Sequence, residues 1–199
     1  MGAEWIRSIN NTVRTYQGAD VSPAEAYGCT VDGTREVASL AAELGVGILL
    51  ENNENTATPD APALAKLKAD VGGVCRVGIA YDPVNAYFQG RDPLEGFEIL
   101  AGQIDVMHMK NVRRQDEDRW DYLPRGNFSY EWTSLADGDL DWRDLLRRAR
   151  QAGFDGPLTF EYVNPFKGMP LKYWDQLREP HEAARIEAEY LRKVLEEIQ

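Results

Sequence analysis

The sequence predicts an α/β fold with a parallel sheet, and two features of the chain indicate it. Short apolar segments that could form buried strands occur four times between residues 46 and 161. Each follows a segment whose apolar residues recur every three or four positions, as on one face of a helix. Strands that are apolar throughout need helices over both faces of an open sheet, or around the outside of a barrel. We therefore expect strands and helices to alternate along the chain.

The first of these cycles lies between residues 32 and 51. Its helix is expected to begin at Asp32 or Thr34, either of which can cap a helix, and to stop at Gly45. The strand then follows over residues 46–50. The face of the helix that turns inward should carry Val37, Leu40, Ala41 and Leu44.

Three further cycles repeat this order. Helices are expected from about Pro59, from about Asp92, and from Trp142 to Gly153, where a glycine again provides a stop. A last helix should begin near Pro180, because apolar residues beyond it share one stripe. The remaining expected strands lie at 5–9, 74–81, 104–107 and 157–160.

Four of the expected strands lead into a side chain that can bind a metal. These residues are Glu51, Asp82, His108 and Glu161. The carboxyl ends of parallel strands meet at one edge, where the active sites of open sheets and barrels lie. If three carboxylates and an imidazole gather there, repulsion between the like charges of the carboxylates would be costly unless a cation lay between them. Oxygen-rich ligation with one nitrogen suits Mn²⁺, Mg²⁺ or Co²⁺, and Zn²⁺ is also compatible.

Composition limits the other interpretations. The 199 residues, 43% of them hydrophobic, suit one domain with a sizeable core. A formal charge of −11 without a basic cluster disfavours a nucleic-acid partner. The sequence shows neither a leader pattern nor a run of about 20 apolar residues, so we expect no membrane partner and a cytoplasmic location.

Six short phrases along the chain resemble those of a known family. They are Leu50-Glu51-Asn52, Asp82-Pro83-Val84-Asn85, His108-Met109-Lys110-Asn111, Gly138-Asp139-Leu140-Asp141-Trp142, Gly153-Phe154-Asp155-Gly156-Pro157 and Phe160-Glu161-Tyr162. In this order they resemble the sugar phosphate isomerase/epimerase group of xylose isomerase-like TIM barrels. The resemblance implies one such domain over residues 1–199, with a divalent metal bound by the four ligands named above.

The resemblance also implies a reaction. In that family the metal grips carbonyl and hydroxyl oxygens of the substrate, and the residues matching Glu51 and Glu161 form the acid/base pair. A metal-dependent isomerase or epimerase of a sugar, sugar phosphate or related hydroxy-carbonyl compound is therefore implied. A metal-assisted dehydratase on the same scaffold is the nearest alternative. Lys110, on the same side of its strand as His108, could stabilise an enediolate oxygen, although a surface lysine fits the sequence equally well.

Three residues are expected to contact the small, sugar-like substrate. Asn53 and Asn85 stand where many relatives carry histidine, so they could hydrogen-bond a polyol but not shuttle protons. Trp120 lies in the long segment 112–137 that follows the His108 strand. We interpret this segment as a lid over the catalytic edge, or else as a surface for a second subunit.

The number of strands falls short of a full barrel. A complete barrel needs eight strand–helix units over about 250 residues, whereas five strands are expected here, and by resemblance residues 5–9 form the fourth. The domain should then lack three N-terminal units, as a truncated frame, a fragment, or a half-barrel completed by a second copy. Open sheet edges favour a homo-oligomer. A non-catalytic remnant that binds metal or ligand is the second alternative, while an endonuclease of related barrel type would need several more histidines than two.

Overall fold

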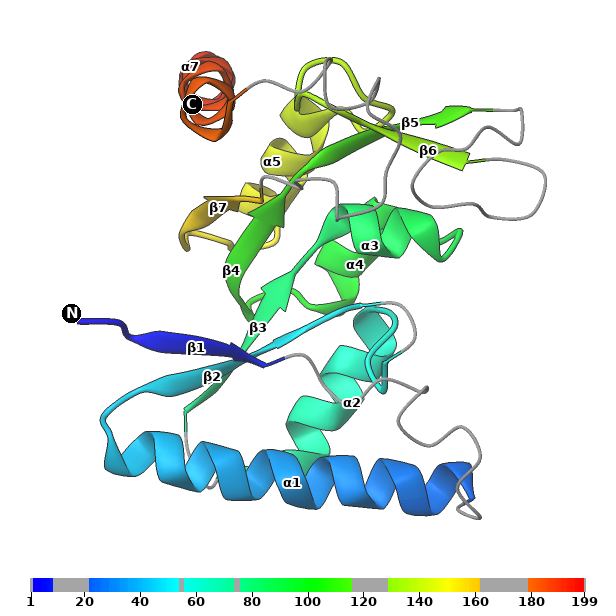
Figure 1. The fold of residues 1–199 in the computed structure, drawn as a ribbon, viewed down its shortest axis with the longest axis vertical. Helices are drawn as coiled ribbons and strands as arrows, with labels where there is room; N and C mark the ends of the chain where they lie inside the picture. Colours follow the sequence, from blue (N-terminus) through cyan, green and yellow to red (C-terminus); the bar gives the residue numbers. More distant parts are fainter. Residues whose placement is uncertain are drawn as a thin grey trace. The chain divides into compact units, whose positions relative to one another are not determined.

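The structure of the chain is a computed structural model, which describes residues 2–8, 22–53, 56–73, 76–115, 129–161 and 179–198. These residues belong to two compact units (Figure 1). The first consists of Met1–His108 and Ala149–Leu158, and the second of Met109–Arg148 and Thr159–Gln199. The chain thus passes from the first unit to the second directly after His108 and again after Leu158.

Five parallel strands make up the main sheet, in the order β1, β2, β3, β4, β7. Neighbours from β1 to β4 pair in parallel register, with Ile6 opposite Ile48 and Leu50 opposite Ile79. The α/β fold and its five parallel strands are therefore confirmed. The bounds are Trp5–Ser8 for β1, Gly47–Glu51 for β2, Val77–Tyr81 for β3, Ile104–Met109 for β4 and Leu158–Phe160 for β7.

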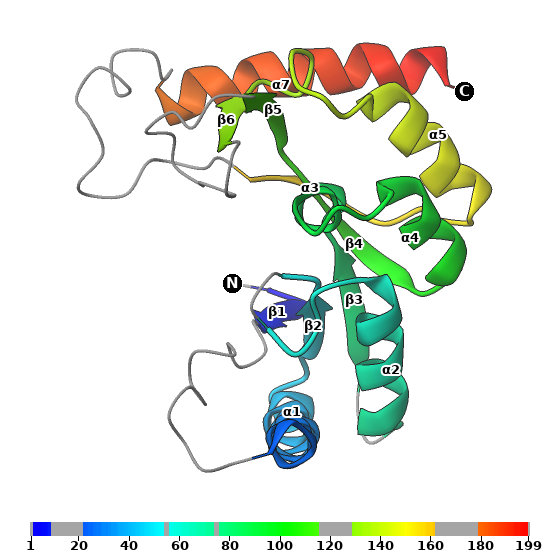
Figure 2. The same ribbon diagram turned by 90° about the vertical axis from the view of Figure 1, so that its right-hand side faces the viewer.

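Helices of the first unit begin where the sequence offers a cap. Asp60 caps α2 (Ala61–Val71) and Asp92 caps α4 (Pro93–Ile99), and each helix has a proline in its first turn. Asp82 caps the short α3 (Pro83–Phe88). Helices α1 (Pro23–Glu43) and α2 contact each other and pack on β2 and β3 (Figures 1 and 2). They cover the sheet as the expected alternation requires.

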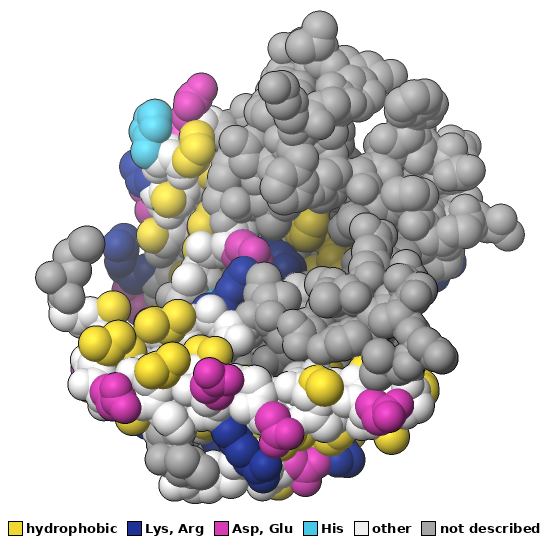
Figure 3. Space-filling model, turned by 60° about the horizontal axis from the view of Figure 1, so that its bottom comes forward, with side chains coloured by type: hydrophobic (Ala, Val, Ile, Leu, Met, Phe, Trp, Pro, Cys, Tyr) yellow, Lys and Arg dark blue, Asp and Glu magenta, His cyan; other side chains and the backbone are white. Residues whose placement is uncertain are grey.

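Helix α1 differs from the prediction in both its start and its buried face. It begins at Pro23, because Ser22 and Glu25 form a capping box, so the start predicted at Asp32 or Thr34 was wrong. Its buried side chains are mostly small, namely Thr30, Val31, Thr34, Ala38 and Ala41. Of the predicted inward residues only Ala41 is buried, whereas Val37, Leu40 and Leu44 are 51%, 55% and 77% exposed. Figure 3 shows hydrophobic side chains gathered on the face that contains α1.

Trp5 of β1 covers one face of the neighbouring strands. Its ring packs on a cluster of Leu49, Ala80 and Val106. A Cβ atom at Gly47 would lie 2.5 Å from this ring, and one at Gly78 would lie 2.8 Å from it. Both distances are too short for real contacts, so glycine at these two strand positions makes room for the indole.

The second unit contains a two-stranded antiparallel sheet of β5 (Asn111–Gln115) and β6 (Ser129–Thr133). The segment 112–137, interpreted as a lid or a subunit surface, contains most of this strand pair. Its residues 116–128 lie outside the described part. The buried Trp142 opens α5 (Trp142–Gln151) and donates from Nε1 to the carbonyl of Lys110, at 3.1 Å. Helix α7 (Pro180–Glu197) is held by buried Glu187, which accepts from the amide of Leu135.

Among the helices that the structure describes, none combines the length and the apolar character that a bilayer span requires.

Candidate metal centre

Three of the four predicted metal ligands lie together in the first unit. Glu51 ends β2, Asp82 follows β3 and His108 lies near the end of β4, so all three stand at the carboxyl edge of the sheet. One ligand atom from each lies within 4.8 Å of the others. They are 1%, 0% and 7% exposed, respectively. The parallel register thus delivers them to one buried place, as the strand pattern predicted.

Glu51 has a polar partner at each carboxylate oxygen. Its Oε1 lies 2.8 Å from Nδ1 of His108, and its Oε2 lies 3.0 Å from Nη1 of Arg7 in β1. Neighbouring ligands of an octahedral ion with bonds of about 2.1 Å are themselves about 3 Å apart. The 2.8 Å between the Glu51 and His108 atoms is a hydrogen-bond distance, and it is also compatible with two ligands of one metal.

Asp82 acts first as a helix cap. Its Oδ1 accepts hydrogen bonds from the amides of Val84 and Asn85, at 2.9 and 3.1 Å, which fixes the side chain at the start of α3. These two bonds use only one of the two carboxylate oxygens. Oδ2 therefore takes no part in these two cap bonds.

The electrostatics of the first unit favour a cation at this place. Glu51 and Asp82 are two buried carboxylates with oxygens less than 5 Å apart. Arg7, 36% exposed, contributes one positive charge beside Glu51. Like charges buried this closely are costly, and a divalent cation between them would remove that cost. The oxygen and imidazole donors therefore fit a divalent metal.

Glu161 and Lys110 belong to the second unit and contact each other. Nζ of Lys110 lies 2.9 Å from Oε2 of Glu161 and 5.8 Å from the centre of the Trp132 ring. Lys110 is only 7% exposed, so it is not the surface lysine that the sequence left open. The amide of Glu161 donates to the carbonyl of Met109, the residue after His108. The roles predicted for Glu161 and Lys110 stay predictions.

The residues expected to contact the substrate have different surroundings. Asn85 is 4% exposed, and its Nδ2 donates to the backbone carbonyl of Asn52 at 2.8 Å. That amide group therefore already has a structural partner. Asn53 is partly exposed after β2, where its backbone amide donates to Thr58. Trp120 lies outside the described residues.

Comparison with known proteins gives the family. The sequence profile of the xylose isomerase-like TIM barrel family matches residues 4–194. The chain belongs to this family. Its five parallel strands with flanking helices are thus part of a (β/α) barrel, as the resemblance implied.

The similar proteins within the family include dehydratases. The 3-dehydroshikimate dehydratase of Bacillus anthracis is 30% identical over 157 residues, which are 74% of this chain and 54% of that protein. An inosose dehydratase of Lacticaseibacillus casei is 25% identical over 146 residues, 71% of this chain and 49% of that protein. This chain spans about half the length of the curated relatives it matches.

Two solved structures of similar fold contain metals. The IOLI protein with a bound zinc atom has a TM-score of 0.71 at 16% identity, over 98% of this chain and 64% of that one. A xylose isomerase-like TIM barrel protein of Mycobacterium smegmatis, in complex with magnesium, has a TM-score of 0.67 at 18% identity, over 98% and 61%. At these identities the likeness shows the fold alone.

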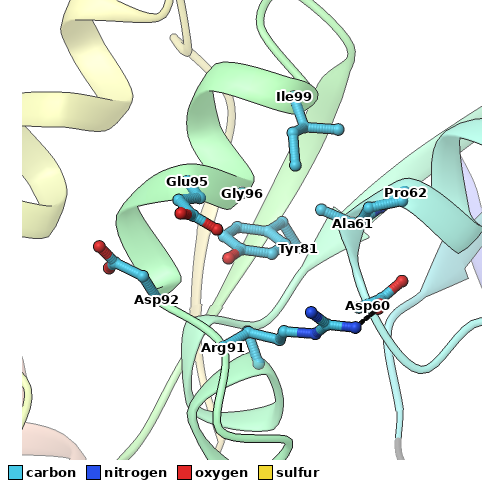
Figure 4. Close-up of a pocket in the computed structure, with 10 residues that line it drawn as sticks. Asp60, Ala61, Pro62, Tyr81, Arg91, Asp92, Glu95, Gly96 and Ile99 are labelled. Carbon is cyan, nitrogen blue, oxygen red and sulfur yellow. Dashed lines mark ion pairs between the residues drawn. The ribbon is translucent and has the colours of Figure 1, made fainter.

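One small cavity in the first unit of this TIM-barrel chain lies apart from the three ligands. It is lined in part by Tyr81 and by the ion pair of Arg91 with Asp60, at 3.2 Å (Figure 4). Its volume is about 50 Å³, which is room for one or two water molecules but not for a sugar. Burial raises the pKa of Tyr81, whose hydroxyl donates to the carbonyl of Pro93.

Sequence reasoning missed two residues of the site, Arg7 and Asn52. Arg7 stands near the carboxyl end of β1, and it reaches Glu51 across the β1–β2 pair. Its position at a strand end was a usable signal, because the predicted ligands stand at the ends of other strands. Asn52 is completely buried and hydrogen-bonds to Asp82. Its place in the phrase Leu50-Glu51-Asn52 was the available signal, but no role was assigned to it from the sequence.

Proposed function

We propose that the chain carries the metal centre of a divalent-metal lyase that removes water from a hydroxy-carbonyl compound. The observation that carries this proposal is the buried meeting of Glu51, Asp82 and His108 at the carboxyl edge of the sheet. A metal there and a proton-transfer reaction on a sugar-like substrate were implied by the resemblance. Mn²⁺, Mg²⁺, Co²⁺ and Zn²⁺ all suit the donors.

We favour loss of water over isomerisation or epimerisation because of the sequence relatives. The two described above are both named as dehydratases, for 3-dehydroshikimate and for inosose. Dehydration and isomerisation both begin with removal of a proton beside a carbonyl, so the same centre serves either reaction. The dehydratase, which was the nearest alternative in the sequence analysis, is therefore the reaction we propose first, and the isomerase or epimerase becomes the alternative.

Glu161 is the proposed fourth ligand and the second acid/base residue. It is supported by its place directly after β7 and by the hydrogen bond that its backbone N–H donates to the carbonyl of Met109, the residue after His108. Lys110, paired with Glu161 and buried, is the proposed donor to the substrate oxygen that becomes negative. Arg7 offsets the charge of Glu51 in the first unit.

A divalent metal held by Glu51, Asp82 and His108 would supply Lewis acidity toward the substrate carbonyl. One carboxylate, Glu51 or Glu161, takes the proton from the carbon beside the carbonyl. The electron pair of the broken C–H bond becomes the new C=C bond, and a hydroxyl leaves from the adjacent carbon. The other carboxyl group protonates this hydroxyl, so that it departs as water. Lys110 donates a hydrogen bond to the carbonyl oxygen throughout.

The test uses the purified chain, Mn²⁺, and 3-dehydroshikimate and inosose as separate substrates. We expect mass spectrometry to detect a product lighter by one water, formed only with metal and abolished by a chelator. Glu51→Gln should reduce the rate at least about 100-fold, since it removes a ligand and a base. Glu36→Gln, the same change at an exposed position of α1, should have no effect.

Other outcomes would support the competing interpretations. Metal-dependent exchange of substrate protons with deuterated water, without loss of water, would favour an isomerase or epimerase. Bound metal with neither exchange nor product would contradict an enzyme and favour the metal-binding remnant. A chain that binds no divalent metal would remove the proposal entirely.

A further inference from the structure

The side chain of Asn52 holds the backbone of Asp82 by two hydrogen bonds. Its Nδ2 donates to the carbonyl of Asp82, and its Oδ1 accepts from the amide of the same residue, both at 2.8 Å. Asn52 is 0% exposed. The side-chain amide of Asn52 thus engages both the donor and the acceptor of one residue.

These bonds continue the pairing of β2 with β3 beyond the end of both strands. The last residue pair in the register is Glu51 with Ala80. One residue further along β2 the backbone no longer pairs, and the Asn52 side chain makes the next two bonds in its place. Asp82 is therefore held at a fixed distance from the strand that carries Glu51.

Two further hydrogen bonds hold the backbone at these ligands. Nδ2 of Asn85 donates to the carbonyl of Asn52, and Oγ1 of Thr58 donates to the carbonyl of Glu51, both at 2.8 Å. All of these groups are buried. Because each buried bond is shielded from water, its loss would leave an unsatisfied peptide group rather than a solvated one.

We infer that Asn52 is a positioning residue of the metal centre, which sets the spacing of Asp82 from Glu51 before a metal binds. The inference rests on the proposed metal site. Asparagine is suited to this task because it offers a donor and an acceptor side by side without a charge. Leucine has a similar size but neither group, and aspartate lacks the donor.

The experiment compares Asn52→Leu with Asn111→Leu. Asn111 is also buried, and its Nδ2 donates to the carbonyls of Leu135 and Leu140 in the second unit. Both variants lose buried amide hydrogen bonds, so both should melt at a lower temperature than the parent. Titration with Mn²⁺, followed by electron paramagnetic resonance of the free ion, should show at least tenfold weaker binding for Asn52→Leu and unchanged binding for Asn111→Leu.

A second measurement does not depend on the metal. In the metal-free protein, hydrogen exchange followed by NMR should be at least tenfold faster at the Asp82 amide in Asn52→Leu, with the other amides of β2 and β3 unchanged. Unchanged exchange at Asp82, or parental Mn²⁺ affinity in Asn52→Leu, would overturn the inference. A parent that fails to bind Mn²⁺ would instead refute the proposed function, and the exchange result would still decide whether Asn52 holds Asp82.

Discussion

Asp82 has two tasks that a single substitution can separate. Its Oδ1 caps α3 through the amides of Val84 and Asn85, while Oδ2 is the oxygen proposed to bind the metal. Asp82→Asn keeps an oxygen for the cap and replaces the other with an NH₂ group, which is not a metal ligand. Asp82→Ala removes both. We therefore expect the first variant to lose metal binding alone, and the second to lose metal binding and stability.

The magnitudes follow from these bonds. Loss of a helix cap costs about 1 kcal/mol, which lowers the melting temperature of a domain of this size by roughly 2–4 °C. Metal-free Asp82→Ala should show this loss. Metal-free Asp82→Asn should melt at or above the parental temperature, since it keeps the cap and removes one of two neighbouring buried charges.

Calorimetry with and without Mn²⁺ measures both effects. At a metal concentration of about 100 times the parental dissociation constant, the parent should gain about 2.7 kcal/mol, or roughly 5–11 °C. Asp82→Asn should gain almost nothing. An equal metal-induced shift in Asp82→Asn and the parent would refute Asp82 as a ligand. A loss of stability in metal-free Asp82→Asn as large as that in Asp82→Ala would refute the separation of the two oxygens.

Two further predictions concern stability. Burial raises the pKa of Tyr81, and the charges of Asp82 and Asp92 add to the effect. The stability that this shift contributes to the folded state is therefore complete below the unfolded-state pKa near 10, and it is lost as the pH rises above that value. Between pH 9 and 11, urea unfolding should show the parent losing about 1.4 kcal/mol more than Tyr81→Phe; parallel pH profiles would contradict this. Leu64→Ala, at a fully buried site of α2, should cost about 2–5 kcal/mol, whereas Leu44→Ala, 77% exposed, should stay within about 0.5 kcal/mol. Similar losses for these two variants would contradict the burial of α1 described here.

The sheet and the meeting of Glu51, Asp82 and His108 at its edge could be predicted because their signals are local. An apolar run predicts a strand, and the Glu51, Asp82 or His108 that follows it marks the carboxyl end of that strand. The parallel arrangement then requires that these ends meet. The roles of Glu161 and Lys110, the homo-oligomer and the cytoplasmic location stay predictions.

The buried face of α1 could not be predicted in the same way. Its large apolar residues and its small ones both recur at helical spacing, so hydrophobicity alone favoured the side with Val37, Leu40 and Leu44. The structure instead turns Ala38 inward beside the predicted Ala41, because small side chains let a helix pack closely on its neighbours. The start of α1 was different, since Ser22 and Glu25 form a capping-box pattern that is visible in the sequence.

Asn52 and Arg7 were missed because their function depends on strand register. An asparagine after a strand is usually solvated, and only its place beside Asp82 makes it a structural partner. In the same way Arg7 contacts Glu51 only because β1 and β2 are neighbours in the sheet. Such cross-strand partnerships require the pairing of the strands to be known first.

The surroundings of Glu51 decide which variant tests its chemistry without unfolding the protein. Glu51→Gln keeps an oxygen that can accept from His108, and it leaves Arg7 without its carboxylate partner. Because Arg7 is 36% exposed, water can reach its guanidinium, and the cost in stability should be small. Glu51→Ala would add a cavity at a fully buried position and confuse lost stability with lost ligation. A loss of metal and turnover in Glu51→Gln at parental metal-free stability would therefore point to the carboxylate itself.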